Sequence, residues 1–276
     1  MLSNKELIAK IKSEHANSKP TDFPTAIVEL PSKGLLYEKS NPLSSGKVMM
    51  RYMDYRAEEI LTDSTYITEG TAYDELCKYL IVSNDSGQII DYNTLTLFDR
   101  DAIFIAARVL GKGSKLKNTV SCKNPSCKHI YIHDVDLTEL DDYDYDFSPY
   151  WVEPHSNKFQ YKLELGDGAY DDIVFKMLSV EDDANIIRHQ NSNGKFKERT
   201  LRLLYRIVSV NGVTDRDAIE QYVTRNLITL YSERLRDYIN QVNKNYKLTY
   251  KSKCPKCGET HTHYVVIGRD FFRLQP

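Results

Sequence analysis

Alternation of apolar and polar residues predicts four short strands in two separate parts of the chain. The alternating segments are residues 25–30, 47–53, 159–165 and 172–178. Gly166-Asp167-Gly168 separates the last two of these segments, and this arrangement predicts a hairpin. A turn at Pro31-Ser32-Lys33-Gly34 is expected to end the first strand, because glycine can adopt a positive φ there.

Apolar residues spaced three and four apart predict helices around these strands. The first predicted helix begins at Asp54. The others cover residues 72–82, 97–110, 179–190, 197–208 and 215–242. Asp54 and Thr214 are the expected N-caps of the first and last helices, and Ser179 forms a capping box with Asp182. The charged run Asp99-Arg100-Asp101 is interpreted as a solvated helix cap and face.

Four cysteines lie at the tips of two more predicted hairpins. They form two close pairs, Cys122 with Cys127 and Cys254 with Cys257, each in a tight turn between strand-like residues. Four thiolates at about 2.3 Å from a zinc ion complete a tetrahedral site that has no open position. The sequence therefore predicts one structural zinc ion per chain, in a zinc ribbon whose halves are separated by residues 128–253.

A redox dithiol or a pair of disulfides would use the same cysteines differently. The pair Cys254-Pro255-Lys256-Cys257 has no helix behind it to lower a thiol pKa. The charged residues 1–19 are not expected to form a secretory signal, so disulfides are disfavoured as well. Zinc is the favoured interpretation, and the fifth cysteine, Cys77, is predicted to be a buried apolar residue on a helix.

Histidines beside the two pairs offer further ligands. They are His129, His133, His261 and His263. Any of them could replace a cysteine or hold a second metal ion. Because four cysteines already fill the coordination shell, roles outside it are favoured.

The start of the chain predicts a short amphipathic helix that ends before Pro20. Its apolar side chains include Leu7 and Ile11, which lie among polar residues. The pattern is equally compatible with an arm that docks on a partner through these side chains and with one that frays.

Composition and charge exclude several classes of function. The 276 residues are 41% hydrophobic, enough for a core, and carry a formal net charge of −2. This charge gives no general attraction to nucleic acid or to an anionic membrane. No apolar run approaches the roughly 18 residues of a membrane span, so no membrane partner is expected. Acidic residues cluster between 134 and 146, where a solvated linker is favoured over a site for a cation or a basic partner.

Together these patterns predict an α+β fold with a helical N-terminal half that contains short strands. The expected parts are an N-terminal arm over residues 1–24, a strand, turn and helical domain over 25–117, and a split zinc-ribbon domain over 118–276. A hairpin with helices, approximately residues 155–245, is expected as an insertion between the two halves of the ribbon.

Several motifs in the first part of the chain resemble one protein family. They are Val28-Glu29-Leu30-Pro31-Ser32-Lys33-Gly34-Leu35-Leu36-Tyr37, Asn41-Pro42-Leu43-Ser44-Ser45-Gly46-Lys47-Val48, Glu58-Glu59-Ile60-Leu61-Thr62 and residues 67–81. This run is similar to that of the baseplate hub assembly proteins of T4-like contractile-tailed phages. The end of the chain, with Asp270-Phe271-Phe272 after the second cysteine pair and a final proline, is similar to that of longer family members. The resemblance implies that Phe271 and Phe272 bind a partner, although Arg273-Leu274-Gln275 departs from the tryptophan expected beside the proline.

The motifs of common enzyme classes are absent from the sequence, including HExxH, GxSxG and phosphate-binding or dinucleotide-binding glycine runs. Gly111-Lys112-Gly113 is interpreted as a helix C-cap followed by a basic loop. The resemblance implies a non-enzymatic structural or assembly protein of a baseplate hub, which binds hub, spike or tape-measure subunits. Such a protein acts in the host cytoplasm during assembly. It then either remains in the tail baseplate of the virion or is released as an assembly factor.

The alternative function is that of a nucleic-acid-binding zinc-ribbon protein, because lysines gather around the cysteine pairs. These lysines are Lys112, Lys115, Lys117, Lys123, Lys128, Lys251, Lys253 and Lys256. The acidic residues 134–146 would oppose a polyanion nearby, so nucleic acid is the disfavoured partner. Salt-dependent binding to single-stranded DNA would distinguish the two functions.

Overall fold

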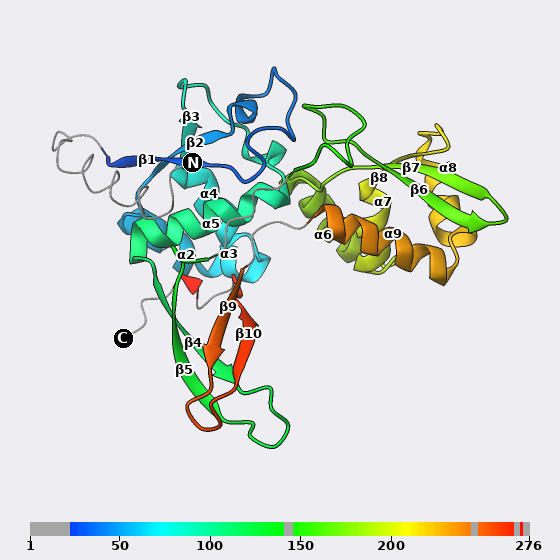
Figure 1. Ribbon diagram of the computed structural model, residues 1–276. Helices are drawn as coiled ribbons and strands as arrows, with labels where there is room; N and C mark the ends of the chain where they lie inside the picture. Colours follow the sequence, from blue (N-terminus) through cyan, green and yellow to red (C-terminus); the bar gives the residue numbers. More distant parts are fainter. Residues whose placement is uncertain (1–22, 141–145, 244–247, 268–270, 273–276) are drawn as a thin grey trace.

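The computed structural model of the chain describes residues 23–140, 146–243, 248–267 and 271–272. It has the expected α+β fold, with helices around small antiparallel sheets. Three parts are visible in Figure 1, which we call the body, the stalk and the lobe. The body and the lobe each contain a three-stranded sheet, and the stalk consists of four strands. Leu7 and Ile11 of the predicted arm lie outside the described residues.

The body holds a sheet of order β1-β2-β3 and the helices of the first half of the chain. Its elements are β1 (Thr25–Glu29), β2 (Lys47–Arg51), α2 (Tyr55–Thr62), α3 (Ser64–Glu69), α4 (Ala72–Leu80), β3 (Ile81–Asn84) and α5 (Leu97–Lys112), with 3-10 turns at Pro42–Ser45 and Tyr92–Thr94. Asp54 caps α2 as predicted, since its side chain accepts the N–H of Ala57. The helix predicted to reach residue 82 ends at Leu80, because the β-branched Ile81 and Val82 extend the sheet as β3.

The lobe is built from the segment between the two cysteine pairs. Its elements are β6 (Phe159–Gly166), β7 (Ala169–Phe175), α6 (Val180–Asn193), α7 (Glu198–Arg206), β8 (Ile207–Val210), α8 (Arg216–Gln221), a π-helical turn (Tyr222–Asn226) and α9 (Thr229–Val242). The predicted capping box is present: Asp182 N–H donates to Ser179 Oγ, and Ser179 N–H donates to Asp182 Oδ2. Helix α6 therefore begins where the sequence predicts.

Two predicted helices in the lobe differ from the structure. The single helix expected over residues 215–242 is wrong, because Ile228 has an extended backbone (φ −62°, ψ 162°) and separates the π-helical turn from α9. Asp215, rather than Thr214, caps α8 and accepts the N–H of Ala218. The helix expected to reach residue 208 ends at Arg206, where the chain enters strand β8.

The sheet of the lobe repeats the arrangement of the sheet in the body. In each, two adjacent antiparallel strands are followed by helices, and the third strand returns to pair with the second. Met50 lies opposite Ile81 in the body, and Phe175 lies opposite Ile207 in the lobe. A register shift immediately before each of these pairs is also the same in both sheets.

Asp99 is buried, and its prediction as part of a solvated face was wrong. Its side chain is fully covered and accepts hydrogen bonds from Ser32 N–H at 2.9 Å, Ser32 Oγ at 2.7 Å and Tyr37 OH at 2.6 Å. Burial raises the pKa of the Asp99 carboxyl, although hydrogen bonds from Ser32 and Tyr37 oppose this shift. Through these hydrogen bonds, Asp99 holds the loop that follows β1 against the start of α5.

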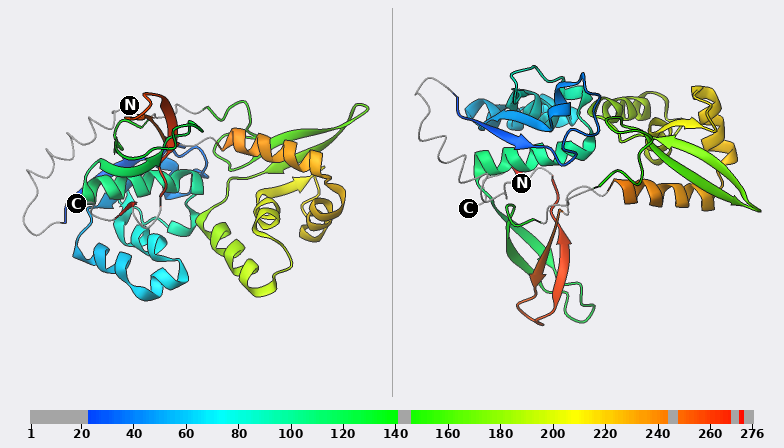
Figure 2. Two further views of the ribbon diagram at one scale, coloured as in Figure 1. Left: turned by 90° about the horizontal axis from the view of Figure 1, so that it is seen from below. Right: turned by 45° about the horizontal axis from the view of Figure 1, so that its top comes forward.

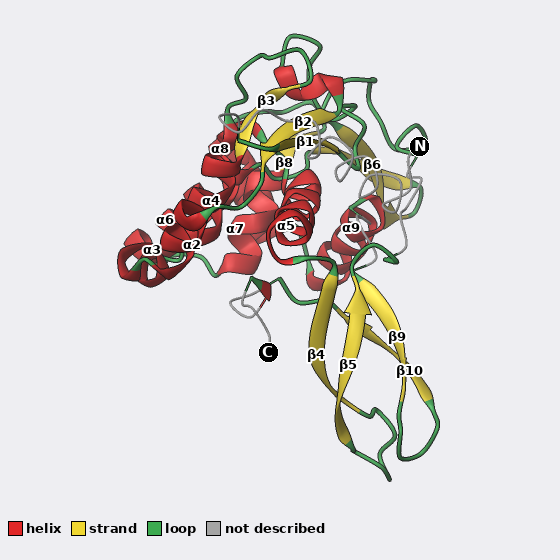
Figure 3. Ribbon diagram, turned by 90° about the vertical axis from the view of Figure 1, so that its left-hand side faces the viewer, coloured by secondary structure: helices red, strands yellow, loops and turns green. Residues whose placement is uncertain are grey.

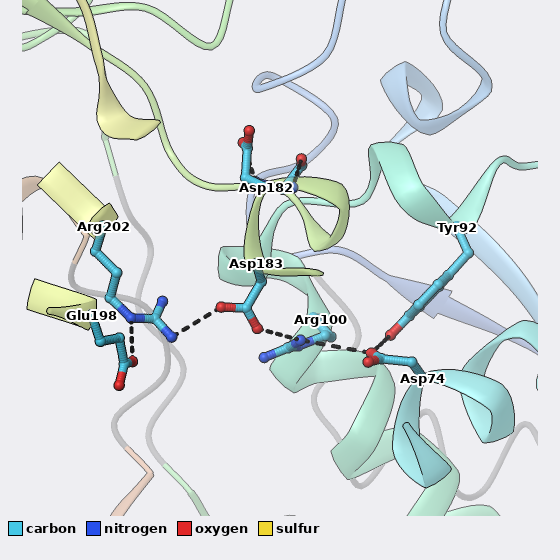
Figure 4. A network of polar contacts seen from close by, with 8 residues as sticks. Asp74, Tyr92, Arg100, Asp182, Asp183, Glu198 and Arg202 are labelled. Atoms are coloured by element: carbon cyan, nitrogen blue, oxygen red, sulfur yellow. Dashed lines mark hydrogen bonds and ion pairs between the residues drawn. The ribbon is translucent and has the colours of Figure 1, made fainter. Parts of the chain in front are cut away.

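Body and lobe share one hydrophobic core and are joined by backbone and ionic contacts. Leu97 N–H donates to Leu178 O at 2.8 Å, and Val180 N–H donates to Leu95 O at 2.9 Å. Beside these bonds, Arg100 of α5 lies between Asp74 of the body and Asp183 of the lobe, as Figure 4 shows. The stalk leaves the body in a different direction from the lobe (Figure 2).

Candidate metal centre

The stalk is formed by two hairpins that are far apart in the sequence. Strands β4 (Lys115–Ser121) and β5 (Ile130–Asp136) form the first hairpin, and β9 (Thr249–Lys253) and β10 (Thr260–Tyr264) form the second. Gly113 is the C-cap of α5, as predicted, and the basic loop after it is short because β4 already begins at Lys115. The two hairpins lie side by side in Figures 1 and 3 and project away from the helices.

Contacts between the two hairpins are mostly polar and aromatic. The hydroxyls of Tyr131 and Ser252 lie 2.7 Å apart, and Asn118 Nδ2 donates to Tyr250 OH at 3.3 Å. The ring of His133 stacks on that of Tyr250, with centroids 5.4 Å apart. Alternation along each strand places these side chains between the hairpins and their sequence neighbours on the outside.

Each hairpin ends in a turn that holds one cysteine pair, which we call a knuckle. Cys122 N–H donates to His129 O and Cys254 N–H donates to Glu259 O, both at 2.8 Å, so the two knuckles close in the same way. The residue after the second cysteine of each pair has a positive φ, 47° for Lys128 and 78° for Gly258. The same backbone course therefore presents both pairs of sulfur atoms to one point.

The four predicted metal ligands meet at the tip of the stalk. The Sγ atoms of Cys122, Cys127, Cys254 and Cys257 all lie within 4.8 Å of one another. Cys122 Sγ is 3.6 Å from Cys257 Sγ, and Cys127 Sγ is 3.9 Å from Cys254 Sγ. Tetrahedral zinc with Zn–S bonds of about 2.3 Å requires sulfur separations of about 3.8 Å. All four cysteines are free rather than paired in disulfides, so the donor set and its dimensions fit a four-thiolate metal ion.

The thiols of this cluster ionise unequally before a metal binds. Burial opposes ionisation of Cys254, but the backbone N–H groups of Cys257 and Lys256 outweigh it and lower the pKa of that thiol to about 7. Burial raises the pKa of the Cys122 thiol to about 12. Cys254 is thus the thiol of the two that ionises more readily near neutral pH, and binding of a metal ion would displace the more strongly held proton of Cys122.

Polar side chains around the cluster hold the knuckles together. Asn124 Nδ2 in the first knuckle donates to Glu259 Oε1 in the second at 2.6 Å. His261 Nε2 lies 3.3 Å from Cys122 Sγ and 3.7 Å from Glu259 Oε2. These contacts were not predicted, although the alternation of His261 and His263 along one strand was a signal that both face one side.

The remaining candidate residues lie away from the metal centre. Phe271 and Phe272 are buried against the body, where Phe272 packs on Tyr73 of α4 and Phe104 of α5. Their surfaces are thus covered by the chain itself, and binding of a partner by these rings stays a prediction. Cys77 is buried in α4, as predicted.

Across the described residues, no helix has the length and apolar character needed to cross a membrane.

A family model described as T4 bacteriophage base plate protein matches residues 36–273. The match includes most of the body, the whole lobe and both hairpins of the stalk. No curated protein and no solved structure gives a significant match.

Proposed function

The chain belongs to the T4 bacteriophage base plate protein family, and from this premise we propose that it is a structural or assembly protein of a contractile-tail baseplate hub. It acts by binding hub, spike or tape-measure subunits. The family match over most of the chain is the observation that carries this proposal. The motifs of residues 28–48, which resemble hub assembly proteins, support the hub in particular.

We propose that Cys122, Cys127, Cys254 and Cys257 bind one structural zinc ion. Four thiolate ligands leave no position for water or substrate, so such a centre supplies stability and no catalysis. It would join the first hairpin of the stalk to the second and so fasten the two ends of the segment that forms the lobe. The domains expected over residues 25–117 and 118–276 would then act as one rigid unit. In this proposal the unit has a structural role and catalyses no reaction.

This role places the chain in the host cytoplasm during assembly and, if it is retained, in the tail baseplate of the virion. A baseplate protein carries out its task through contacts with its neighbours, and the exposed stalk is a feature suited to such contacts (Figure 3).

A second candidate function, binding of nucleic acid by the ribbon, is favoured by the lysines around the knuckles. Single-strand binders combine basic grooves with aromatic side chains on which bases stack. In the stalk, the rings of His133 and Tyr250 stack on each other between the hairpins. This arrangement favours protein partners over nucleic acid.

A nonsense mutation in the gene, with the intact chain supplied in trans as control, tests the proposed function. The expected result is loss of complete contractile tails in electron micrographs, with recovery in the control. Mass spectrometry of purified virions from the control decides whether the protein stays in the baseplate. Normal numbers of complete tails in the uncomplemented mutant would contradict the proposal.

A further inference from the structure

The tip of the stalk is strongly basic, whereas the rest of the chain is acidic. Five lysines at the knuckles are exposed, and one carboxylate, that of Glu259, accompanies them. The lysines are Lys123, Lys128, Lys251, Lys253 and Lys256. The tip therefore carries a charge of +4 (five minus one), and the remainder carries −6, since the whole chain has −2.

An aliphatic patch lies beside this basic tip on the outer face of β5. Ile130 and Ile132 are 65% and 69% exposed, an unusual position for two isoleucines on one strand face. Their partners across the hairpin, Ser121 and Thr119, have short side chains that leave the isoleucines open to solvent. The patch begins two residues after Lys128 and is thus continuous with the tip.

We propose that the outer face of β5 and the adjoining lysines dock on an acidic protein surface with an apolar centre. Protein interfaces combine an apolar core with a polar rim, and here the isoleucines supply the core and the lysines the rim. A positive tip on an otherwise negative molecule directs association towards an acidic partner and away from another copy's tip. This inference rests on the proposed function and names the surface and the partner chemistry that the function would use.

The orientation of the aromatic side chains favours protein over nucleic acid as the occupant. Tyr250 stacks with His133 on one side and with His263 on the other, at 5.4 Å and 5.7 Å between centroids. These rings fill the space between the hairpins, while the outer face beside the tip presents aliphatic side chains. Aliphatic side chains form apolar interface cores but offer no platform on which bases stack.

Two double variants of the patch test the proposal. Each baseplate and tail subunit encoded with the chain is expressed singly with a tag, and its affinity for the purified zinc-loaded chain is measured. Ile130→Glu with Ile132→Glu is expected to weaken binding of the partner about tenfold or more, as loss of central anchors does. Ile130→Lys with Ile132→Lys is expected to weaken it less, because the partner is acidic. Ile89→Glu is the matched control, since Ile89 is 85% exposed on the body.

The outcomes separate this inference from the proposed function. Unchanged affinity of both patch variants for a subunit that binds the wild type would overturn the docking surface and leave the function standing. Binding to no subunit would overturn the function, and with it the inference. If the wild type bound oligo-dT tightly and in a salt-dependent manner, and the double Glu variant did not, the partner would be nucleic acid rather than an acidic protein. Metal content and the thermal midpoint of each variant show that the stalk remains folded.

A different observation carries a second inference, which concerns the matching sheets of body and lobe. Ile81-Val82-Ser83 of β3 and Ile207-Val208-Ser209 of β8 are identical and occupy equivalent positions in register. The same five residues occur near the start of the helix that follows each third strand. They are Asp99-Arg100-Asp101-Ala102-Ile103 within α5, and Asp215-Arg216-Asp217-Ala218-Ile219, in which Asp215 is the N-cap of α8.

Further positions of the two units correspond in both structure and chemistry. The N-cap of the helix after the second strand is Asp54 in the body and Ser179 in the lobe, which are 125 residues apart (179 minus 54). Ile103 and Ile219 are both buried, at 0% and 1% exposure. We infer that body and lobe are two copies of one ancestral unit, with the first stalk hairpin placed between them, so that each chain presents two related surfaces.

Self-comparison of family sequences tests this duplication. An alignment of family members, compared with itself at every offset, is expected to score highest near the 125-residue offset that pairs Asp54 with Ser179. A score at this offset no better than that of shuffled sequences would overturn the duplication. That result would leave the docking surface unaffected, because the docking surface rests on other residues.

Discussion

At the scale of single residues, the cluster of four cysteines was predictable and the buried carboxylate was not. The cysteine pairs are local patterns, since two or four residues within a turn decide that both sulfurs face one point. Asp99 has the same sequence appearance as a solvated helix residue. Its burial depends on Ser32 and Tyr37, which come from a loop more than 60 residues earlier. Contacts of this kind follow from tertiary packing and leave no periodic signal.

The burial of Asp99 leads to a prediction for its replacement. Asp99→Ala leaves the N–H and hydroxyl of Ser32 and the hydroxyl of Tyr37 buried without their acceptor. We expect the free energy of unfolding in urea to fall by about 2–4 kcal/mol, because unsatisfied buried donors are costly. Tyr37→Phe removes one donor to Asp99, which stays bonded to Ser32, but it also removes the acceptor of the Thr96 N–H. It should therefore cost less than Asp99→Ala, about 1–2 kcal/mol. Equal stability of Asp99→Ala and Tyr37→Phe would contradict this role.

At the scale of elements, the loop between β1 and β2 is held by two glycines in close contact. Leu30 N–H donates to Gly46 O at 2.8 Å, and Gly34 packs directly against Ser44 and Gly46 with a φ of 77°. A Cβ atom at Gly34 would lie 2.3 Å from Ser44 O. The sequence predicted a turn at Gly34 but could not indicate that a second turn lies against it.

Substitution of Gly34 is therefore expected to be far more harmful than substitution of a glycine in open space. Gly34→Ala combines a strained φ with a backbone clash, whereas Gly70→Ala has a similar φ of 75° and no atom within 4 Å. We expect about 1 kcal/mol of destabilisation at Gly70 and at least about 3 kcal/mol at Gly34. Comparable urea midpoints for the two variants would show that the loop yields to the added methyl group.

The two helices that were predicted to extend too far into a third strand share one physical cause. Helical spacing continued through Ile81-Val82 and Ile207-Val208, but pairing with a neighbouring strand ended both helices. Those segments also belong to the identical runs that mark the repeated units. The repeat was therefore present in the sequence, and the inserted stalk hairpin and unequal loops obscured it.

At the scale of the whole molecule, an ionic chain joins body to lobe, as Figure 4 shows. Arg100 Nη1 lies 3.7 Å from Asp74 Oδ1 and 3.5 Å from Asp183 Oδ2, and Arg202 Nη2 lies 2.9 Å from Asp183 Oδ1. Arg100 is thus the cation that separates two carboxylates from different parts of the molecule. Its removal leaves Asp74 and Asp183 facing each other across the junction.

Loss of Arg100 is expected to weaken the coupling of lobe to body. The single tryptophan, Trp151, stacks on Phe147, which in turn contacts Phe98 of α5, so its fluorescence reports on this junction. For Arg100→Ala we expect a fluorescence transition in urea that precedes the far-UV circular dichroism transition. In Arg202→Ala the two transitions should coincide, because Arg100 still bridges the carboxylates. Coincident transitions in Arg100→Ala would contradict a joining role for this residue.

The proposed zinc ion would lie between two hairpins that are distant in sequence. Elemental analysis of protein purified without added metal, combined with a count of reactive thiols, tests for this ion. We expect one zinc per chain and protected thiols in the native protein. Four thiols should become reactive after chelation, and Cys77, buried in α4, should react only after denaturation. Absence of metal together with four thiols that react without chelation would show that the two hairpins do not close around a metal ion.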